Sequence, residues 1–210
     1  AAIDKLEGMQ KWDGAISYWP GGENYNGWTN VYAAHFLVEA QKAGYQVNSS
    51  SLTNLLTFIK NRVGTSRTEM YTLEDGTVVN IAAKDILYGL FVLAVAGERM
   101  ESVLNFYKSR TDLLTSDTQM LLAAAFALSG DRNTYRSLLK TDYSPVRAST
   151  GGSFSSPLRD LSIMLYVLAE TDPANAKTGE LIRRVSSSLK TENGWWNTQE
   201  RSFALLALGK

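Results

Sequence analysis

The stretch ILYGLFVLAVAGERMESVLNFYKS, residues 86–109, decides the fold of this chain. Its first half is almost continuously apolar up to Gly97, whereas its second half, Met100–Ser109, places apolar residues at helical spacing among polar ones. Glycine at such a position ends a helix, because it adopts left-handed backbone angles without strain. The stretch therefore predicts a helical hairpin in which one helix is buried and its partner faces solvent.

The same alternation extends in both directions along the chain. The apolar segments are Val31–Ala43, Ile86–Ala96, Met120–Leu128, Leu161–Ala169 and Phe203–Leu208. The amphipathic segments between them are Leu52–Val63, Met100–Ser109, Tyr135–Lys140 and Gly179–Leu189. From residue 86 onward the apolar segments recur at intervals of roughly 35–40 residues, which is typical of stacked helical hairpins. Such hairpins form either an open solenoid or a closed ring of inner and outer helices.

Local signals mark the ends of these helices. Candidate N-caps are Asn48–Ser51, then Ser116 or Asp117, and Ser156 before Pro157, and candidate glycine stops are Gly44, Gly97, Gly130 and Gly209. The segment 65–80 contains Asp75-Gly76 between short β-prone runs, which predicts a small loop or β-hairpin insertion. Because the helical pattern resumes after each loop, residues 1–210 are predicted to form a single all-α domain.

Composition and charge favour neither nucleic acid nor membrane as a partner. Hydrophobic residues make up 44% of the 210 residues, and 21 Lys and Arg balance 21 Asp and Glu. A formal net charge of zero offers no long-range attraction for nucleic acid or anionic lipid. No apolar run approaches the ~20 residues of a membrane span, and the start lacks a signal-peptide pattern. We expect the chain to be a domain excised from a longer protein, or a processed product.

The residues that carry most enzyme chemistry are scarce here. Cysteine is absent and His35 is the single histidine, which excludes disulfides and Cys nucleophiles and disfavours zinc sites and Ser-His-Asp triads. Neither a Walker A motif nor GxGxxG occurs. We therefore predict no catalytic residue, no metal site and no cofactor. His35 lies in an apolar helix, where a buried histidine bonded to a neighbouring helix is favoured over a catalytic base.

Two sets of side chains leave an alternative open. Glycoside hydrolysis needs two carboxyl groups facing each other across a cleft. The candidate carboxylates are Asp13, Glu23, Glu69, Asp85 and Asp160, and the favoured interpretation is that they are solvated loop acids and helix caps. The aromatic residues Trp12, Tyr18, Trp19, Tyr25, Trp28, Trp195 and Trp196 predict either packing at the open ends of the hairpins or a ligand or interaction surface. A carbohydrate-active or sugar-binding ring of helical hairpins is thus the alternative function.

Three stretches in order resemble the thioester-containing domain of bacterial alpha-2-macroglobulins, and they span nearly the whole chain. The first covers residues 3–47 and has the pattern L-x-x-M-Q, then D-G, an aromatic loop, and a helix that begins at a Trp and closes in Gly-Tyr. Its matching residues are Leu6, Met9, Gln10, Asp13, Gly14, Trp28, Tyr32, Phe36, Leu37, Ala40, Gly44 and Tyr45, with Asn30 after Thr29. The later stretches are residues 156–160 (SPLRD) and residues 196–200 (WNTQE), which lead into residues 203–208.

This resemblance implies a fold and a role. The family's domain is an α/α toroid, here an incomplete ring, inside large bacterial envelope proteins that trap proteases as endopeptidase inhibitors. In those proteins, cleavage of a bait region exposes a Cys–Gln thioester that captures the protease covalently. The family's Cys-x-Glu-Gln motif lies N-terminal to the matched region, and this chain has no Cys. The chain would then house or shield the thioester region, without enzyme activity and with no inhibition by itself.

The resemblance also implies partners, a location and one further position. The partners would be neighbouring domains of the parent protein and its target proteases, and the location would be the periplasm or cell envelope, with the parent lipid-anchored. In complement relatives, a histidine past the Asp-Gly aspartate makes the thioester reactive. The corresponding position in this chain, eleven residues after Asp13 when counted without gaps, is Asn24. An asparagine at this position resembles the arrangement in amine-preferring alpha-2-macroglobulins.

Overall fold

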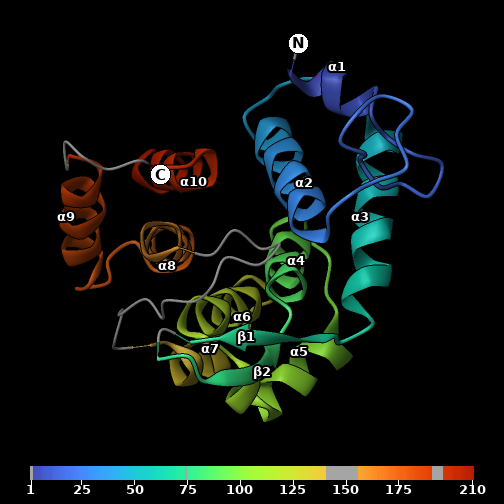
Figure 1. The fold of residues 1–210 in the computed structure, drawn as a ribbon. Coiled ribbons are helices and arrows are strands. Elements are labelled where there is room, and N and C mark those ends of the chain that lie inside the picture. The colour runs from blue at the N-terminus through green and yellow to red at the C-terminus, as the bar shows by residue number, and fades with distance from the viewer. Residues whose placement is uncertain (1, 74, 141–155, 191–195) are drawn as a thin grey trace.

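The computed structural model describes residues 2–73, 75–140, 156–190 and 196–210, which are mostly helical with one small β-hairpin (Figure 1). The inner row of helices comprises α2 (Gly27–Lys42), α4 (Lys84–Val95), α6 (Ser116–Leu128), α8 (Pro157–Thr171) and α10 (Thr198–Leu208). The outer helices are α3 (Ser49–Val63), α5 (Glu101–Ser109), α7 (Arg132–Leu138) and α9 (Thr178–Leu189). The remaining elements are α1 (Ala2–Glu7), the 3-10 helix η1 (Thr111–Leu113), β1 (Thr68–Thr72) and β2 (Val78–Ala82). The predicted alternation of apolar and amphipathic helices is confirmed.

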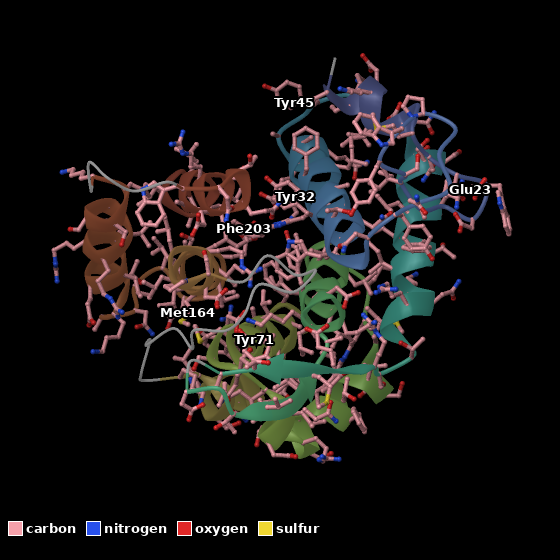
Figure 2. All side chains as sticks on the ribbon, in the orientation of Figure 1. Glu23, Tyr32, Tyr45, Tyr71, Met164 and Phe203 are labelled. Carbon is pink, nitrogen blue, oxygen red and sulfur yellow. The ribbon has the colours of Figure 1, made fainter. Side chains whose placement is uncertain are left out.

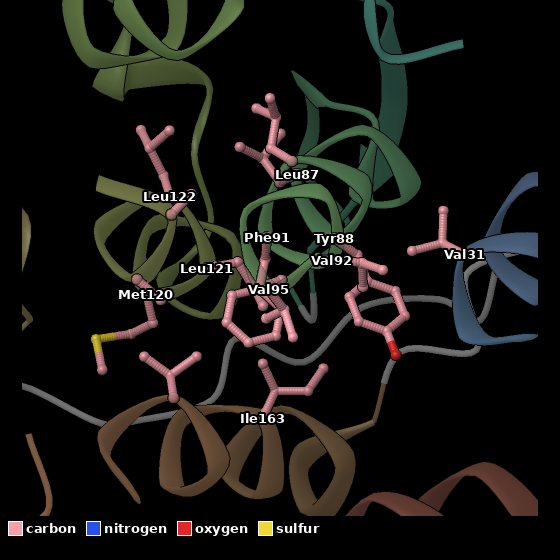
Figure 3. Packing of buried hydrophobic residues seen from close by; sticks show 14 of the residues in the cluster. Val31, Leu87, Tyr88, Phe91, Val92, Val95, Met120, Leu121, Leu122 and Ile163 are labelled. Carbon is pink, nitrogen blue, oxygen red and sulfur yellow. The ribbon is translucent and has the colours of Figure 1, made fainter. Parts of the chain in front are cut away.

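The inner helices are buried on more sides than the outer helices. In α4, 11 of 12 residues are buried, whereas in α9 only Leu181 and Val185 are buried out of 12. Each inner helix packs against the next one in the row, from α2 to α4, α6, α8 and α10, and the row bends round as Figure 1 shows. Side chains such as Phe91, Met120 and Ile163 fill the space between α4, α6 and α8 (Figure 3).

The predicted helix ends are mostly confirmed. The Asn48 side chain accepts hydrogen bonds from the backbone N–H groups of Ser50 and Ser51, and Ser156 accepts one from Arg159. Backbone φ angles of +86°, +84° and +89° at Gly44, Gly97 and Gly130 are the left-handed values that glycine adopts at helix ends. Gly209, in contrast, has a φ of −84°, so α10 ends there without a left-handed residue.

The cap predicted at the start of α6 is wrong. Thr115 occupies the N-cap position, so Ser116 and Asp117 lie inside the first turn. The Thr115 hydroxyl bonds to the Asp117 carboxylate and to Thr118 rather than to the helix backbone. Asp117 faces the interior, where it meets a charged side chain of another helix, and this contact explains the difference.

A β-hairpin between α3 and α4 confirms the predicted insertion. Strands β1 and β2 pair antiparallel, with Thr68 opposite Ala82 and Thr72 opposite Val78. In the turn, the Asp75 carboxylate accepts a hydrogen bond from the Thr77 N–H at 2.8 Å. The hairpin brings the start of β1 beside the first turn of α4, and this placement matters for the site below.

Among the described residues, we find no helix with the length and hydropathy to cross a membrane.

Candidate functional site

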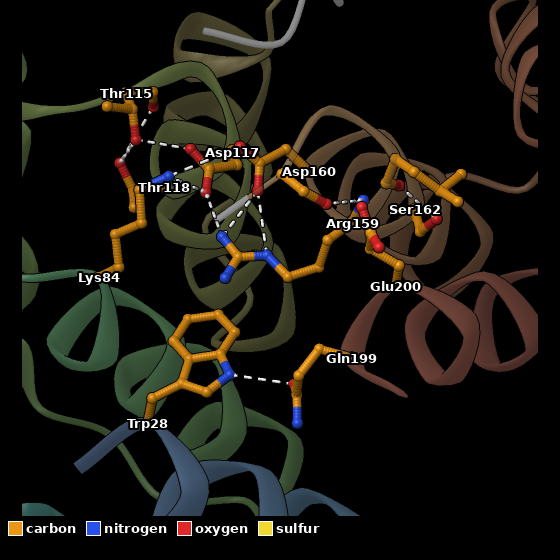
Figure 4. Close-up of polar contacts among 12 residues, drawn as sticks. Trp28, Lys84, Thr115, Asp117, Thr118, Arg159, Asp160, Ser162, Gln199 and Glu200 are labelled. Atoms are coloured by element: carbon orange, nitrogen blue, oxygen red, sulfur yellow. Dashed lines mark hydrogen bonds and ion pairs between the residues drawn. The ribbon is translucent and has the colours of Figure 1, made fainter. Parts of the chain in front are cut away.

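The first turns of the five inner helices converge at one end of the molecule (Figure 4). Lys84 at the start of α4 lies 2.9 Å from Asp117 in α6, measured from Nζ to Oδ2. The guanidinium of Arg159 in α8 lies 4.4 Å from the ring centroid of Trp28 in α2. Trp28 Nε1 in turn donates a hydrogen bond of 3.2 Å to Gln199 Oε1 in α10. The inner helices therefore all begin at this end, where the positive ends of their dipoles gather.

Four charged side chains form a buried cluster there, which we call the ion cluster: Lys84, Asp117, Arg159 and Asp160. Each is at most 3% exposed. Arg159 lies 2.7 Å from Asp160 and 3.6 Å from Asp117, and Lys84 lies 3.6 Å from Asp160. Two cations and two carboxylates thus balance each other, which is the condition under which charges are tolerated away from water.

The pKa values within the ion cluster follow from burial and from the neighbouring charges. Burial raises the pKa of Asp117, but the charges of Lys84 and Arg159 outweigh it and leave that pKa lowered. For Asp160, burial and the nearby Asp117 charge prevail, and its pKa is raised. Burial lowers the pKa of Lys84, yet its two carboxylate neighbours raise it on balance. The cluster is therefore a charged clamp that joins α4, α6 and α8.

The interpretation of the candidate carboxylates as solvated acids and caps is wrong for two of the five. Asp160 belongs to the ion cluster, and Asp85 is 5% exposed, with its carboxylate held by Arg62 and Arg67. The interpretation is wrong because these acids lie in first turns of inner helices, and the convergence of those turns buries them.

The other three carboxylates are more exposed. Glu23 is exposed and pairs with Lys11 at 2.9 Å, and Asp13 accepts a hydrogen bond from the Ala15 N–H. Glu69 is half-buried and lines a hollow of about 330 Å³ together with Asp85. Burial raises the pKa of Glu69. The two arginine contacts of Asp85 make it a structural acid.

His35 is buried between neighbouring helices, as predicted. Its Nδ1 lies 2.8 Å from the Tyr88 hydroxyl in α4, and its Nε2 lies 3.0 Å from the Tyr166 hydroxyl in α8. Burial lowers the pKa of His35 to about 4, so the ring is neutral at neutral pH. His35 therefore joins three inner helices as a neutral hydrogen-bonding group. In the described residues, no three His, Asp or Glu side chains gather as a metal site would require.

The pKa of His35 predicts a pH-dependent stability. The unfolded chain binds a proton below its ordinary value of 6.5, whereas the folded chain stays neutral down to about 4. Between these values the unfolded state binds more protons, so stability falls as the pH falls through this window, by up to about 3 kcal/mol. Urea unfolding at several pH values across the window measures the slope. We expect the slope to flatten in His35→Gln, and an unchanged slope in that variant would contradict the assignment to His35.

The aromatic residues singled out by sequence do not form one cluster. Tyr18, Trp19 and Tyr25 lie exposed on the loop before α2, where Asn24 is also exposed and accepts the Tyr18 N–H through its carbonyl. Trp28 is 2% exposed and lies within the converging helix starts. Trp196 is half-buried against the core, and Trp195 lies outside the described residues. Trp12, also singled out, is 93% exposed.

An apolar groove runs between the first and the last inner helices. Tyr32 of α2 and Phe203 of α10 contact each other beside it (Figure 2), with ring centroids 5.5 Å apart. Beside them is a hollow of about 310 Å³ lined by Phe36 and Leu205, among others. It adjoins a second hollow of about 490 Å³ that Phe36 also lines and that ends at Tyr45. We call these two hollows together the α2/α10 groove, and no sequence pattern pointed to it.

Comparison with known proteins identifies where this arrangement occurs. No family model matches the chain. An alpha-2-macroglobulin from Xylella fastidiosa strain Temecula1 is 21% identical over 216 residues, covering 100% of this chain and 13% of the relative. The alpha-2-macroglobulin of strain 9a5c matches with the same identity and coverage. The chain therefore spans about an eighth of the length of the curated relatives that it matches.

Solved structures agree with the sequence comparison. Trypsin-activated alpha-2-macroglobulin from Escherichia coli matches 98% of this chain with a TM-score of 0.75 and 22% identity, over 14% of its own length. A native E. coli alpha-2-macroglobulin fragment, from domain MG7 to the C-terminus, matches 98% of this chain over 32% of its length, with a TM-score of 0.75 and 21% identity. Salmonella alpha-2-macroglobulin reacted with methylamine matches 97% over 13% of its length, with a TM-score of 0.79 and 19% identity. The whole chain thus corresponds, in sequence and in fold, to one part of bacterial alpha-2-macroglobulins.

Proposed function

We propose that this chain is most of the thioester-domain toroid of a bacterial alpha-2-macroglobulin and contributes to protease trapping by shielding the thioester region. The full-length match to one part of such proteins supports the proposal. The curved row of inner helices with an outer layer has the form that an α/α toroid requires. In this role the domain shields a reactive acyl group from water, and it is not itself an enzyme.

The observation that carries the proposal is the exposed apolar α2/α10 groove. Helices α4, α6 and α8 each pack along two inner neighbours, whereas α2 packs along α4 and α10 along α8, and α2 meets α10 through side chains such as Tyr32 and Phe203. Between α2 and α10 lies the apolar α2/α10 groove, in which Phe36 is 41% and Leu205 69% exposed. One further apolar helix would cover both side chains and complete the ring. We assign this place to the segment that carries the thioester motif, because a thioester survives only where water is excluded.

The experiment uses the parent protein that contains this chain. Methylamine opens a thioester and releases a thiol, which a colorimetric thiol reagent counts. We expect about one thiol per parent chain to be released on methylamine or protease treatment. In the variant Leu205→Asp, the charge in the groove is expected to loosen the packed helix, so that thiol appears without any trigger at a rate roughly tenfold or more above that of the wild type.

The matched control is Met70→Asp. Met70 is 74% exposed on β1, away from the groove, and is comparable in exposure with Leu205. If Met70→Asp releases thiol as fast as Leu205→Asp, the groove is not the seat of the thioester segment. If methylamine releases no thiol from the wild-type parent, the thioester role itself is wrong. The isolated 210-residue chain is expected to leave trypsin activity unchanged, because it lacks the acyl group.

The carbohydrate-active alternative is less well supported. Glu69 and Asp85, two of the candidate acids, line one hollow, but Arg62 and Arg67 hold the Asp85 carboxylate. A hydrolase of this class needs one carboxylate free to act as base or nucleophile. Asp85 does not meet this requirement.

The remaining parts of the proposal rest on the same resemblance. We place the parent in the periplasm or cell envelope, lipid-anchored, with neighbouring domains and target proteases as its partners.

Asn24 is exposed on the loop before α2, and the start of α2 is at the same end as the ion cluster. We assign Asn24 a place near the thioester, which would then favour amines over hydroxyls. Tyr18, Trp19 and Tyr25 on the same loop are assigned to contacts with a neighbouring domain.

A further inference from the structure

Two adjoining hollows lie where α2 begins, α3 ends and β1 begins. The first, of about 330 Å³, has polar walls that include Asn26, Glu69 and Asp85. The second, of about 390 Å³, has a largely apolar wall that includes Phe58. Tyr25, Arg62 and Arg67 line both hollows, so the two form one continuous depression, which we call the arginine hollow.

The two arginines are held in fixed orientations. Arg62 donates through Nε to one oxygen of the Asp85 carboxylate, and Arg67 donates through Nη2 to the other at 3.2 Å. The Asp85–Arg62 pair packs directly on the Cα atom of Gly27, where any larger residue would collide with both side chains. A side chain at position 27 would therefore require the Asp85 carboxylate or the Arg62 guanidinium to move.

The arginine hollow has a surplus of hydrogen-bond donors. A guanidinium carries five N–H groups in a rigid fork. The described residues give Arg62 and Arg67 one acidic partner, Asp85, and each uses a single nitrogen on it. The Arg67 side chain is 50% exposed and that of Arg62 is 25% exposed, and both residues line the hollow, so part of each side chain is accessible to a ligand there. Such a pair of oriented forks is suited to a carboxylate.

Glu69 is the one other acidic group in the arginine hollow. Burial and the charge of Asp85 raise its pKa. The charge that reaches the surface of the hollow is positive, because the Arg67 side chain is 50% exposed whereas that of Asp85 is 6% exposed. Beside this polar half, Tyr25 and Phe58 contact each other edge to face, with centroids 5.3 Å apart, and form the apolar half.

We propose that the arginine hollow is a docking site for a protein segment that carries an acidic side chain next to an aromatic or large aliphatic one. The carboxylate binds the free N–H groups of Arg62 and Arg67, and the apolar side chain lies against Tyr25 and Phe58. The proposal stands apart from the thioester role, because the residues that line the arginine hollow differ from those that line the α2/α10 groove.

The test follows the side-chain Nε–H signals of Arg62 and Arg67 by NMR in the 210-residue chain. The probe is the blocked dipeptide N-acetyl-Glu-Phe-amide, and the neutral control is N-acetyl-Gln-Phe-amide. We expect the acidic probe to shift both signals in a saturable manner and to bind roughly tenfold or more tightly than the neutral one, because a charge-assisted bond is lost in the control. Equal affinity for the two dipeptides would overturn the proposal.

Variants and a simple anion complete the test. Arg67→Gln is expected to weaken binding roughly tenfold while Arg62 still pairs with Asp85 and the melting temperature is retained. The matched control is Arg99→Gln, because Arg99 has a similar exposure of 45% and pairs with Glu101 elsewhere on the surface. Unchanged binding in Arg67→Gln would contradict the assignment. Acetate that binds as tightly as the acidic dipeptide would show a site for small anions only, and docking of a protein segment would then be wrong.

Discussion

Replacing Lys84 with methionine is expected to lower the free energy of unfolding by about 3–5 kcal/mol, because it leaves buried carboxylates without enough positive charge. Lys84 is 1% exposed and contacts both Asp117 and Asp160. Without it, Arg159 alone faces two carboxylates that no water can reach. The larger part of this loss comes from the stranded charge rather than from the missing hydrogen bond.

Urea unfolding of three variants separates these contributions. Lys60→Met is the matched control, because Lys60 pairs with Glu98 at 2.7 Å but both side chains are about a third or more exposed. It is expected to change the free energy of unfolding by less than about 1 kcal/mol. The double variant Lys84→Met with Asp117→Leu removes one charge of each sign and is expected to recover at least half of the loss. A Lys84→Met variant no less stable than Lys60→Met would show that the ion cluster is not a clamp.

Replacing Trp28 with alanine is expected to cost about 3–5 kcal/mol, as for a large aromatic side chain removed from a core. Trp28 contacts three other inner helices. Its ring centroid lies 4.7 Å from that of Tyr88 in α4 and 6.0 Å from that of Phe203 in α10, and Arg159 of α8 lies over its face. The truncation therefore opens a cavity at the point where α2, α4, α8 and α10 meet.

Two controls determine what Trp28 contributes. Trp12 is 93% exposed, so Trp12→Ala is the matched change of the same residue type and is expected to stay within about 0.5 kcal/mol of the wild type. Gln199→Ala removes the partner of the indole N–H and leaves the ring in place, and we expect a loss of about 1 kcal/mol. If Trp28→Ala behaves like Trp12→Ala, the helix starts do not depend on the indole ring.

The helical architecture was predictable because the degree of burial of a helix determines how many of its residues are apolar. A helix buried on all sides, such as residues 86–95, needs apolar residues throughout, and its outer partner needs them on one face. The side chains of Asn48, Ser156 and Asp75 bond to backbone groups within a few residues of their own positions. Their roles at helix starts and in a turn could therefore also be predicted from the sequence. The resemblance to alpha-2-macroglobulins was carried by ordered motifs across nearly the whole chain.

The contacts between helices were not predictable from the same signals. Lys84, Asp117 and Arg159 are far apart in the sequence. A single charged residue next to an apolar helix predicts a solvent-exposed side chain, not a buried ion pair. One signal was available: an acidic residue recurs in the first turn of four inner helices, at Asp85, Asp117, Asp160 and Glu200. The arginine hollow and the α2/α10 groove depend on how the row of helices bends, and no local pattern encodes that curvature.

The contact between Trp28 and Gln199 has a consequence for the order of folding. The two residues are 171 positions apart, whereas each hairpin forms between neighbours in the chain. Closing so long a loop costs more entropy than closing a short one, and contacts of this kind form late. The neighbouring hairpins would associate first, and the junction between α2 and α10 would close last. The same junction would then be the first to open in native-state hydrogen exchange, with Tyr32 and Phe203 separating before the other inner contacts.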